Sequence, residues 1–246
     1  MNTRFFLRSL ATAFLFHLPL ATCPLPLSAA QSPIKNVLFL ISDDLKASVL
    51  GCYGDEVCRT PNIDALAKTG MVFERAYCQG TSCAPSRQSF MHSRYQGAAG
   101  VNLGEHFIEN GWYSARVGKI YHMRVPGNII MGEHGADIAS TWSERFNSPG
   151  VEAHIPGDYA CLNLDIFTTD RTMRESTRMG NRMFVTVSYE GDGSEQPDYK
   201  SASRAIELLR EHGENPFFLA VGFVRPHYPM VVPRKYFDLY PWEEIE

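Results

Sequence analysis

Two kinds of hydrophobic pattern alternate along this chain. Residues 36–41 and 217–223 are near-continuous apolar runs, which are typical of buried strands in a parallel sheet. Residues 112–117 and 183–190 predict two further strands, the second by its alternation of apolar and polar positions. Candidate strands are therefore spread over the length of the chain.

Helices are predicted between these strands. Residues 60–70 place Thr before Pro at the first helical position, then apolar residues at helical spacing, then Gly at the end. Residues 103–110 predict a second short helix, and Asp198 is predicted to cap a third helix that stops near Gly213. This order of strand, helix and strand favours an α/β sandwich with a mostly parallel central sheet.

The stretch from about residue 127 to residue 180 has no regular hydrophobic period. It is rich in Gly, Pro, Ser and charged residues, so we expect a long excursion with little regular structure rather than a linker between two domains. The rest of the chain is long enough for one domain of ordinary size.

The N-terminal segment has the pattern of a secretory signal peptide. Arginines precede an apolar run at residues 10–20, and a small-residue cleavage site, Ser-Ala-Ala, follows at residues 28–30. We therefore expect residues 1–30 to be removed and residues 31–246 to be exported, into the periplasm or out of the cell. The run is too short to span a bilayer comfortably, so we expect no stable membrane span, and a membrane anchor is the minor alternative.

Charge and cysteine content narrow the class of partner. The formal net charge of -4 provides no basic field for nucleic acid, so no nucleic acid is expected as a partner. Export permits disulfides, and if one of the cysteines beyond residue 30 is modified, the remaining four allow three pairings that the sequence does not rank. The cysteines beyond residue 30 are Cys52, Cys58, Cys78, Cys83 and Cys161.

The most specific motif is Cys-Ala-Pro-Ser-Arg at residues 83–87. Pro85 suits the first turn of a helix, so Cys83 is predicted at a helix N-terminus. Backbone N–H groups and the positive end of the helix dipole favour an anion there. The alternative is that Cys83 pairs with Cys78 or packs as a small apolar residue.

This string resembles the signature of the formylglycine-dependent sulfatases, within the alkaline phosphatase superfamily. The resemblance implies that a formylglycine-generating enzyme oxidises Cys83 to an aldehyde, that the hydrate of this aldehyde attacks sulfur, and that Arg87 steadies it. A covalent sulfated enzyme would then expel sulfate through the second hydroxyl. Residues 91–94 read Met-His-Ser-Arg, whereas relatives usually carry a Leu-Thr-Gly-Arg-like string there.

Asp43 and Asp44 follow the first predicted strand. Asp residues after a strand often form turns or cap helices. Beside the signature, however, the resemblance implies that both carboxylates and the modified Cys83 bind a divalent cation. Hard oxygen ligands select Ca²⁺ or Mg²⁺, and Ca²⁺ is the more usual in this family.

Three further residues match family strings that follow strands. Lys119 and His122 lie in Gly-Lys-Ile-Tyr-His at residues 118–122, and His227 lies in Arg-Pro-His-Tyr-Pro at residues 225–229. In isolation they would be an exposed Lys and structural histidines. The resemblance implies that Lys119 contacts the sulfate, that His122 orients or polarises the hydrate, and that His227 protonates the leaving alcohol.

Within the family, these strings look most like the iduronate-2-sulfatase branch, over most of residues 36–124 and 198–241. The resemblance implies a sulfuric ester hydrolase acting on a sulfated sugar or polysaccharide, such as a glycosaminoglycan. Two alternatives stay open: a phosphate or phosphonate monoesterase of the same superfamily, and an inactive glycan-binding remnant.

Relatives continue past the point matching Tyr240 with further cation ligands, a second Lys and a smaller C-terminal subdomain. No Asp-His-Gly string of that kind occurs in this chain. We therefore expect residues 31–246 to be the N-terminal part of a sulfatase catalytic domain. We also expect that this part alone is poorly soluble and nearly inactive, because strands meant to be covered would be left partly bare.

Overall fold

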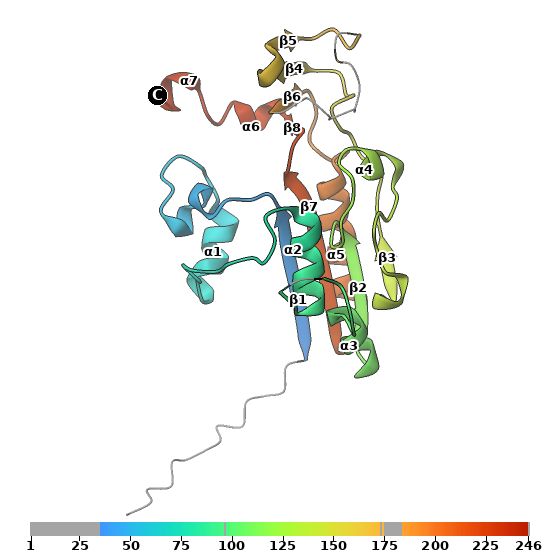
Figure 1. Ribbon diagram of the computed structural model, residues 1–246. Coiled ribbons are helices and arrows are strands. Elements are labelled where there is room, and N and C mark those ends of the chain that lie inside the picture. Colours follow the sequence, from blue (N-terminus) through green and yellow to red (C-terminus); the bar gives the residue numbers. More distant parts are fainter. Residues whose placement is uncertain (1–34, 96, 173, 175–183, 246) are drawn as a thin grey trace, which may run out of the picture. The chain divides into compact units, whose positions relative to one another are not determined.

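The computed structural model (Figure 1) describes residues 35–95, 97–172, 174 and 184–245. The signal peptide predicted over residues 1–30 lies outside the described residues.

The main sheet is parallel throughout. Its order is β1-β7-β2-β3, so the first strand of the chain pairs with a strand that is distant in sequence, with Asn36 opposite Phe217. The sheet therefore confirms the predicted α/β class with a parallel central sheet. Its strands are β1 (Asn36–Asp43), β2 (Tyr113–Gly118), β3 (Glu144–Phe146) and β7 (Phe217–Pro226).

Helices cover both faces of β7, which lies between β1 and β2 in the sheet. Helix α5 (Pro197–His212) packs Ala205 and Leu208 against the face that carries Leu219. The opposite face carries Phe218, whose ring stacks on Phe107 with ring centroids 4.6 Å apart. Each buried side chain of this size contributes about 1.5–3 kcal/mol to folding, so the helices that cover β7 hold the sheet together.

Strand β1 differs from its prediction as a fully buried strand. It is the edge strand of the sheet, and its side chains alternate between packed and exposed. Leu38 and Leu40 are 45% and 50% exposed because α5 covers β7 and β2 but does not reach them. An apolar run in the sequence predicts a strand whose side chains are buried, but it does not show that the described residues bury them.

The short helices agree with the sequence at their ends. Helix α1 (Pro61–Thr69) and α3 (Leu103–Glu109) lie within two residues of their predictions, and Asn102 caps α3 in a capping box with Glu105. The other α-helices are α2 (Cys83–His92), α4 (Gly127–Met131), α6 (Arg234–Phe237) and α7 (Trp242–Ile245). Short 3-10 helices span Ala47–Val49, Gly51–Tyr53, Ala139–Thr141 and Leu162–Leu164.

A second, mixed sheet corrects the expectation that residues 127–180 have little regular structure. Its order is β5-β4-β6-β8, with a core formed by Tyr159, Val187 and Val231. Two of its strands and β3 of the main sheet come from that stretch, and they are too short to show a hydrophobic period. The strands are β4 (Asp158–Cys161), β5 (Ile166–Thr168), β6 (Val185–Tyr189) and β8 (Met230–Pro233).

Asp198 is not the N-cap that the sequence predicts. Helix α5 begins at Pro197, and its N-cap is Gln196. The carboxylate of Asp198 instead accepts hydrogen bonds from the backbone N–H groups of Val224, at 2.7 Å, and Arg225, at 2.9 Å. It therefore joins the start of α5 to the end of β7.

No helix within residues 35–95, 97–172 and 184–245 is long and apolar enough to cross a membrane. Within this part of the chain, Cys78 and Cys83 are not joined in a disulfide, and Cys52 and Cys58 are also thiols.

Candidate active site

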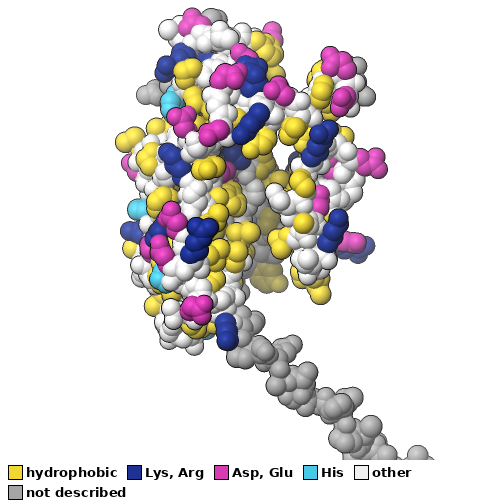
Figure 2. Space-filling model, turned by 180° about the vertical axis from the view of Figure 1, so that it is seen from behind, with side chains coloured by type: hydrophobic (Ala, Val, Ile, Leu, Met, Phe, Trp, Pro, Cys, Tyr) yellow, Lys and Arg dark blue, Asp and Glu magenta, His cyan; other side chains and the backbone are white. Residues whose placement is uncertain are grey.

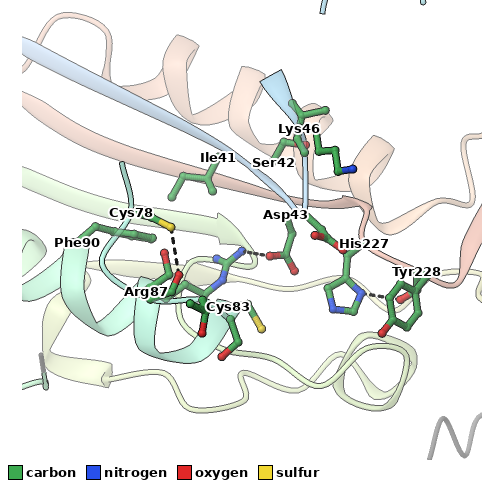
Figure 3. Close-up of a pocket in the computed structure, with 16 residues that line it drawn as sticks. Ile41, Ser42, Asp43, Lys46, Cys78, Cys83, Arg87, Phe90, His227 and Tyr228 are labelled. Atoms are coloured by element: carbon green, nitrogen blue, oxygen red, sulfur yellow. Dashed lines mark hydrogen bonds and ion pairs between the residues drawn. The ribbon is translucent and has the colours of Figure 1, made fainter. Parts of the chain in front are cut away.

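The residues singled out in the sequence meet where the parallel strands end. Asp43 is the last residue of β1, Lys119 follows β2, His227 follows β7, and Cys83 is the first residue of α2. Asp43, Cys83 and His227 line one cavity of about 580 Å³ (Figure 3). This position, beyond the carboxyl ends of the strands, is the usual ligand crevice of an open α/β sheet.

Asp43 lies between two cationic side chains. Its Oδ1 is 2.9 Å from Nη2 of Arg87, and its Oδ2 accepts from Nζ of Lys119. All three side chains are at most 6% exposed. Burial by itself raises the pKa of Asp43, but the two cations together outweigh it and hold the pKa below the ordinary value.

Arg87 anchors helix α2 to the end of β2. Its Nη1 donates to the carbonyl oxygens of Lys119 and of Ile120, the latter at 2.8 Å, while its Nη2 binds Asp43. Both terminal nitrogens of the guanidinium are therefore occupied by protein groups, so Arg87 fixes the wall of the cavity that it lines.

Lys119 is positioned by two glycines on adjacent strands. Its backbone N–H donates to the carbonyl oxygen of Gly222 at 2.9 Å. Gly118 has a φ of 70°, in the left-handed region, and a Cβ there would overlap the carbonyl oxygen of Gly222. A Cβ on Gly222 would overlap the backbone of Lys119. The close approach of β2 and β7 therefore requires glycine at both positions.

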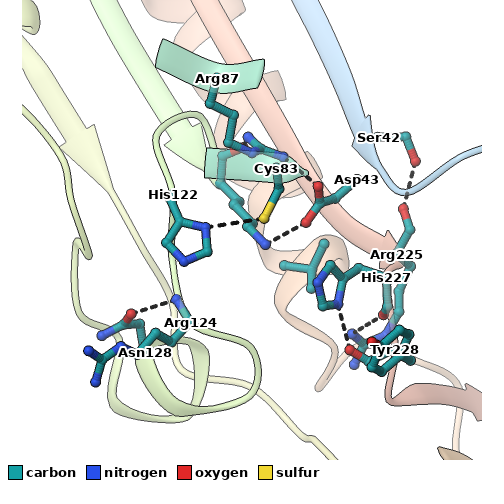
Figure 4. Close-up of polar contacts among 12 residues, drawn as sticks. Ser42, Asp43, Cys83, Arg87, His122, Arg124, Asn128, Arg225, His227 and Tyr228 are labelled. Atoms are coloured by element: carbon teal, nitrogen blue, oxygen red, sulfur yellow. Dashed lines mark hydrogen bonds and ion pairs between the residues drawn. The ribbon is translucent and has the colours of Figure 1, made fainter. Parts of the chain in front are cut away.

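Cys83 faces a histidine across the mouth of α2. Its Sγ lies 3.2 Å from Nδ1 of His122 (Figure 4). The side chain of Ser82, the N-cap of α2, makes no capping hydrogen bond. Burial first, and then the charges of Lys119 and Arg87, lower the pKa of His122. His122 is therefore neutral at pH 7, so its Nδ1 can accept a proton from a group at position 83.

His227 is held by its backbone and by one ring nitrogen. Its N–H donates to the carbonyl oxygen of Asp43 at 3.0 Å, and its Nδ1 lies 2.6 Å from the carbonyl oxygen of Tyr228. A carbonyl only accepts, so Nδ1 carries the hydrogen. This leaves Nε2 as the nitrogen available to a ligand.

The proposed cation ligands do not form a complete site. Asp44 is exposed, with a φ of 64°, and both oxygens of Asp43 already bind cationic side chains. Among the described residues, no group of three or more His, Cys, Asp or Glu side chains is placed so that it could hold a metal ion. Ca²⁺ takes about six to eight oxygen ligands. The described residues supply oxygen donors of the right kind but too few of them, so they do not complete a cation site by themselves.

Residues that the sequence did not single out lie behind His227. Arg225 pairs with the fully buried Glu152, with Nη2 and Oε2 2.9 Å apart, and Asp198 holds the backbone of Arg225. Glu152 lies in the stretch without a hydrophobic period, so no sequence signal marks it. Arg225 belongs to the string around His227, and its charge beside a strand end was the one available signal.

The sulfatase family model matches residues 35–243. Iduronate 2-sulfatase of Homo sapiens is 34% identical over 229 residues, which is 85% of this chain and 38% of that protein. A sulfatase of Formosa agariphila is 28% identical over 239 residues, 86% of this chain and 43% of that protein. The chain thus spans less than half the length of these relatives.

Solved structures share the fold. A structure from work on glycosaminoglycan metabolism by Bacteroides thetaiotaomicron matches with a TM-score of 0.55 and 20% identity, over 84% of this chain and 54% of that one. The phosphonate monoester hydrolase of Agrobacterium radiobacter matches with a TM-score of 0.54 and 21% identity, over 84% of this chain and 44% of that one. At this level of identity the likeness shows the fold alone.

Proposed function

Because this chain belongs to the sulfatase family, we propose that it supplies the nucleophile-bearing part of a sulfuric ester hydrolase. The substrate class is a sulfated sugar or polysaccharide, by similarity to iduronate 2-sulfatase. One observation carries the proposal: Cys83 begins a ten-residue helix, faces His122 at 3.2 Å and lines a cavity with Asp43.

Position 83 fits a formylglycine. Its side chain faces a cavity, at a helix N-terminus whose dipole favours the negative charge of a sulfate. The hydrated aldehyde supplies a hydroxyl that attacks sulfur and a second hydroxyl whose deprotonation releases sulfate, chemistry that a thiol lacks. Maturation would require a formylglycine-generating enzyme as a partner.

The residues around position 83 divide the remaining work. Lys119 is fully buried and brings positive charge next to Asp43, behind the cavity, where it would attract sulfate oxygens, and Arg87 holds Lys119 and Asp43 in place. His122 is neutral and would accept a proton from the group at position 83. His227 presents Nε2, which would donate a proton to the leaving alcohol once the ring is protonated.

We propose Ca²⁺, with Mg²⁺ as the alternative, as the cofactor of the complete enzyme, with Asp43 and Asp44 as the ligands supplied by this chain. Since the described residues do not complete such a site, no catalytic step is assigned to it. Calorimetry is expected to show weak Ca²⁺ binding to this chain, weakened further in Asp44→Asn. Unchanged Ca²⁺ affinity in that variant would remove Asp44 from the ligand set.

We also propose that the chain is exported, as its first 30 residues indicate. Sulfated polysaccharides are charged and large, so an enzyme that acts on them has to reach them outside the cytoplasm. A fusion of residues 1–34 to a reporter measures export directly, and retention of the reporter in the cytoplasm would contradict this proposal.

The decisive experiment is co-expression with a formylglycine-generating enzyme. The mass of the peptide that carries residue 83 reports conversion, and release of sulfate from an aryl sulfate reports activity, with Cys83→Ala as the matched control. Faster turnover of an aryl phosphate or phosphonate than of the sulfate would favour a phosphomonoesterase or phosphonate esterase. If Cys83 stays an unmodified thiol and the chain binds a sulfated sugar without releasing sulfate, the result would favour an inactive glycan-binding remnant.

A further inference from the structure

Arg225 makes contacts in four directions immediately behind the cavity. Its backbone N–H donates to Asp198, and its carbonyl oxygen accepts from the hydroxyl of Ser42 at 2.6 Å. Its Nη1 donates to the carbonyl oxygen of His227 at 3.2 Å (Figure 4), and its Nη2 lies 2.9 Å from Oε2 of Glu152. One residue therefore joins the end of β1, the end of β7, the start of α5 and the segment before β4.

The ion pair between Arg225 and Glu152 lies in the protein interior. Glu152 is fully buried, and its carboxylate makes no hydrogen bond within the described residues, so the charge of Arg225 is its main compensation. Burial raises the pKa of Glu152, and Arg225 opposes that effect. Truncating one member of such a pair leaves the other as an uncompensated buried charge.

The contacts of Arg225 converge on the backbone of two residues of the cavity. His227 is bound through its carbonyl oxygen, and its N–H donates to the carbonyl oxygen of Asp43. Ser42, whose hydroxyl donates to the carbonyl oxygen of Arg225, directly precedes Asp43. His227 also lies in the short connection from β7, in the main sheet, to β8, in the second sheet. The two cavity residues are thus fixed to each other through Arg225.

We propose that Arg225, held by Glu152 and Asp198, is a positioning residue that sets the orientation of the His227 imidazole relative to Asp43. This inference rests on the proposed function only for its kinetic readout. Arg225 touches no reacting group itself, so its removal should change how well His227 is placed and leave the charge that attracts substrate to the cavity in place.

The test compares Glu152→Gln, Arg225→Lys and Ser42→Ala with the wild-type chain. Arg225→Lys keeps the charge that Glu152 requires, but a single ammonium cannot replace the two nitrogens that reach Glu152 and the His227 carbonyl oxygen. Ser42→Ala removes one hydroxyl from a half-buried surface and is the mildest change. The control is Asp137→Asn, which breaks a buried pair with Arg116, 1% exposed on each side, on residues that do not line the cavity.

Two readouts separate positioning from stability. The first is the ring C–H resonance of His227 in protein labelled at histidine, with and without inorganic sulfate. The second is aryl sulfate turnover by protein converted at Cys83. We expect the His227 resonance to move in all three variants and kcat to fall about tenfold to a hundredfold, with KM changed less than about twofold. Asp137→Asn should lower stability but leave the resonance in place.

An unchanged His227 resonance in folded Arg225→Lys and Ser42→Ala overturns the proposal, whether or not Glu152→Gln folds. An equal displacement in Asp137→Asn also overturns it, because the effect would then be one of general destabilisation. If the converted wild type releases no sulfate while the resonance still moves in the variants, the positioning role stands and only the proposed function fails.

Discussion

At the scale of single residues, Asp43 is the charge on which the candidate site depends. A carboxylate buried with Arg87 and Lys119 neutralises cations that would otherwise repel each other at the end of the sheet. Breaking a buried pair by removing one partner costs about 3–5 kcal/mol, whereas an exposed pair is worth about 1 kcal/mol or less. The two aspartates at the end of β1 should therefore respond very differently to the same change.

Asp43→Asn is expected to lower the free energy of unfolding by about 3–5 kcal/mol, because it leaves two buried cations without their anion. Asp44→Asn is the control: Asp44 is exposed, so a change within about 0.5 kcal/mol is expected. Urea unfolding at pH 7 measures both. Equal losses in the two variants would contradict the central role of Asp43.

His122 predicts a dependence of stability on pH. Its pKa in the folded chain lies below the ordinary 6.5, because of burial and then of Lys119 and Arg87. Between that lowered value and 6.5 the unfolded chain binds more protons, so stability rises with pH across this window and is lost as the pH falls through it. His122→Asn should show a shallower loss between pH 7 and pH 5.5 in urea unfolding. A slope as steep as that of the wild type would show that other groups carry the effect.

At the scale of elements, helix α2 ends at a residue that is poorly suited to its backbone. Ser93, the C-cap, has φ 51° and ψ 45°, the left-handed conformation that glycine adopts most readily. The Leu-Thr-Gly-Arg-like string that residues 91–94 resemble has Gly at this point, and glycine suits this backbone conformation. Ser at position 93 is therefore expected to destabilise only the C-terminal end of α2, which is the end opposite to Cys83.

Ser93→Gly is expected to stabilise the chain by about 0.5–1 kcal/mol, since it relieves left-handed strain at an exposed site. Ser93→Ala is the matched control and should give no gain, because alanine retains the Cβ. Urea midpoints compare the three chains. A gain in the alanine variant equal to that in the glycine variant would exclude backbone strain as the cause.

The elements also show where sequence reasoning works and where it stops. Long apolar runs predicted β1 and β7, and Asp43 and His227 were placed by the strand ends that precede them. Glu152 and the true role of Asp198 were missed because their partners are distant in sequence, and no local pattern encodes them. The three-residue strands β3 and β5 were missed because they are too short to show a period.

At the scale of the whole molecule, apolar surface is left uncovered. Hydrophobic side chains gather in the middle of the face seen in Figure 2. On the edge strand β1, Leu38 and Leu40 are about half exposed, and on helix α1, Leu66 is 64% exposed. Contiguous exposed apolar surface of this kind promotes association. The expectation that strands would be left partly bare is met on β1.

Replacing Leu38 and Leu40 by Thr is expected to increase the monodisperse fraction of the purified chain, with a change in stability within about 0.5 kcal/mol, since both positions are exposed and Thr favours strands. Light scattering after size-exclusion chromatography measures the first effect and urea unfolding the second. Leu219→Thr, on the buried neighbouring strand, is the control and should unfold the chain. An unchanged aggregated fraction in the double variant would show that Leu38 and Leu40 are not part of the surface through which the chain associates.

The paired glycines beside Lys119 reverse the usual logic of mutational scanning. Alanine normally tests a position by deleting atoms, but at Gly118 and Gly222 it would add a methyl group where two backbones already touch. Neither glycine offers a functional group, yet both should tolerate substitution as poorly as the reactive residues themselves. The position of Lys119 thus depends on two residues that have no side chain, and a survey of contributing side chains would overlook them.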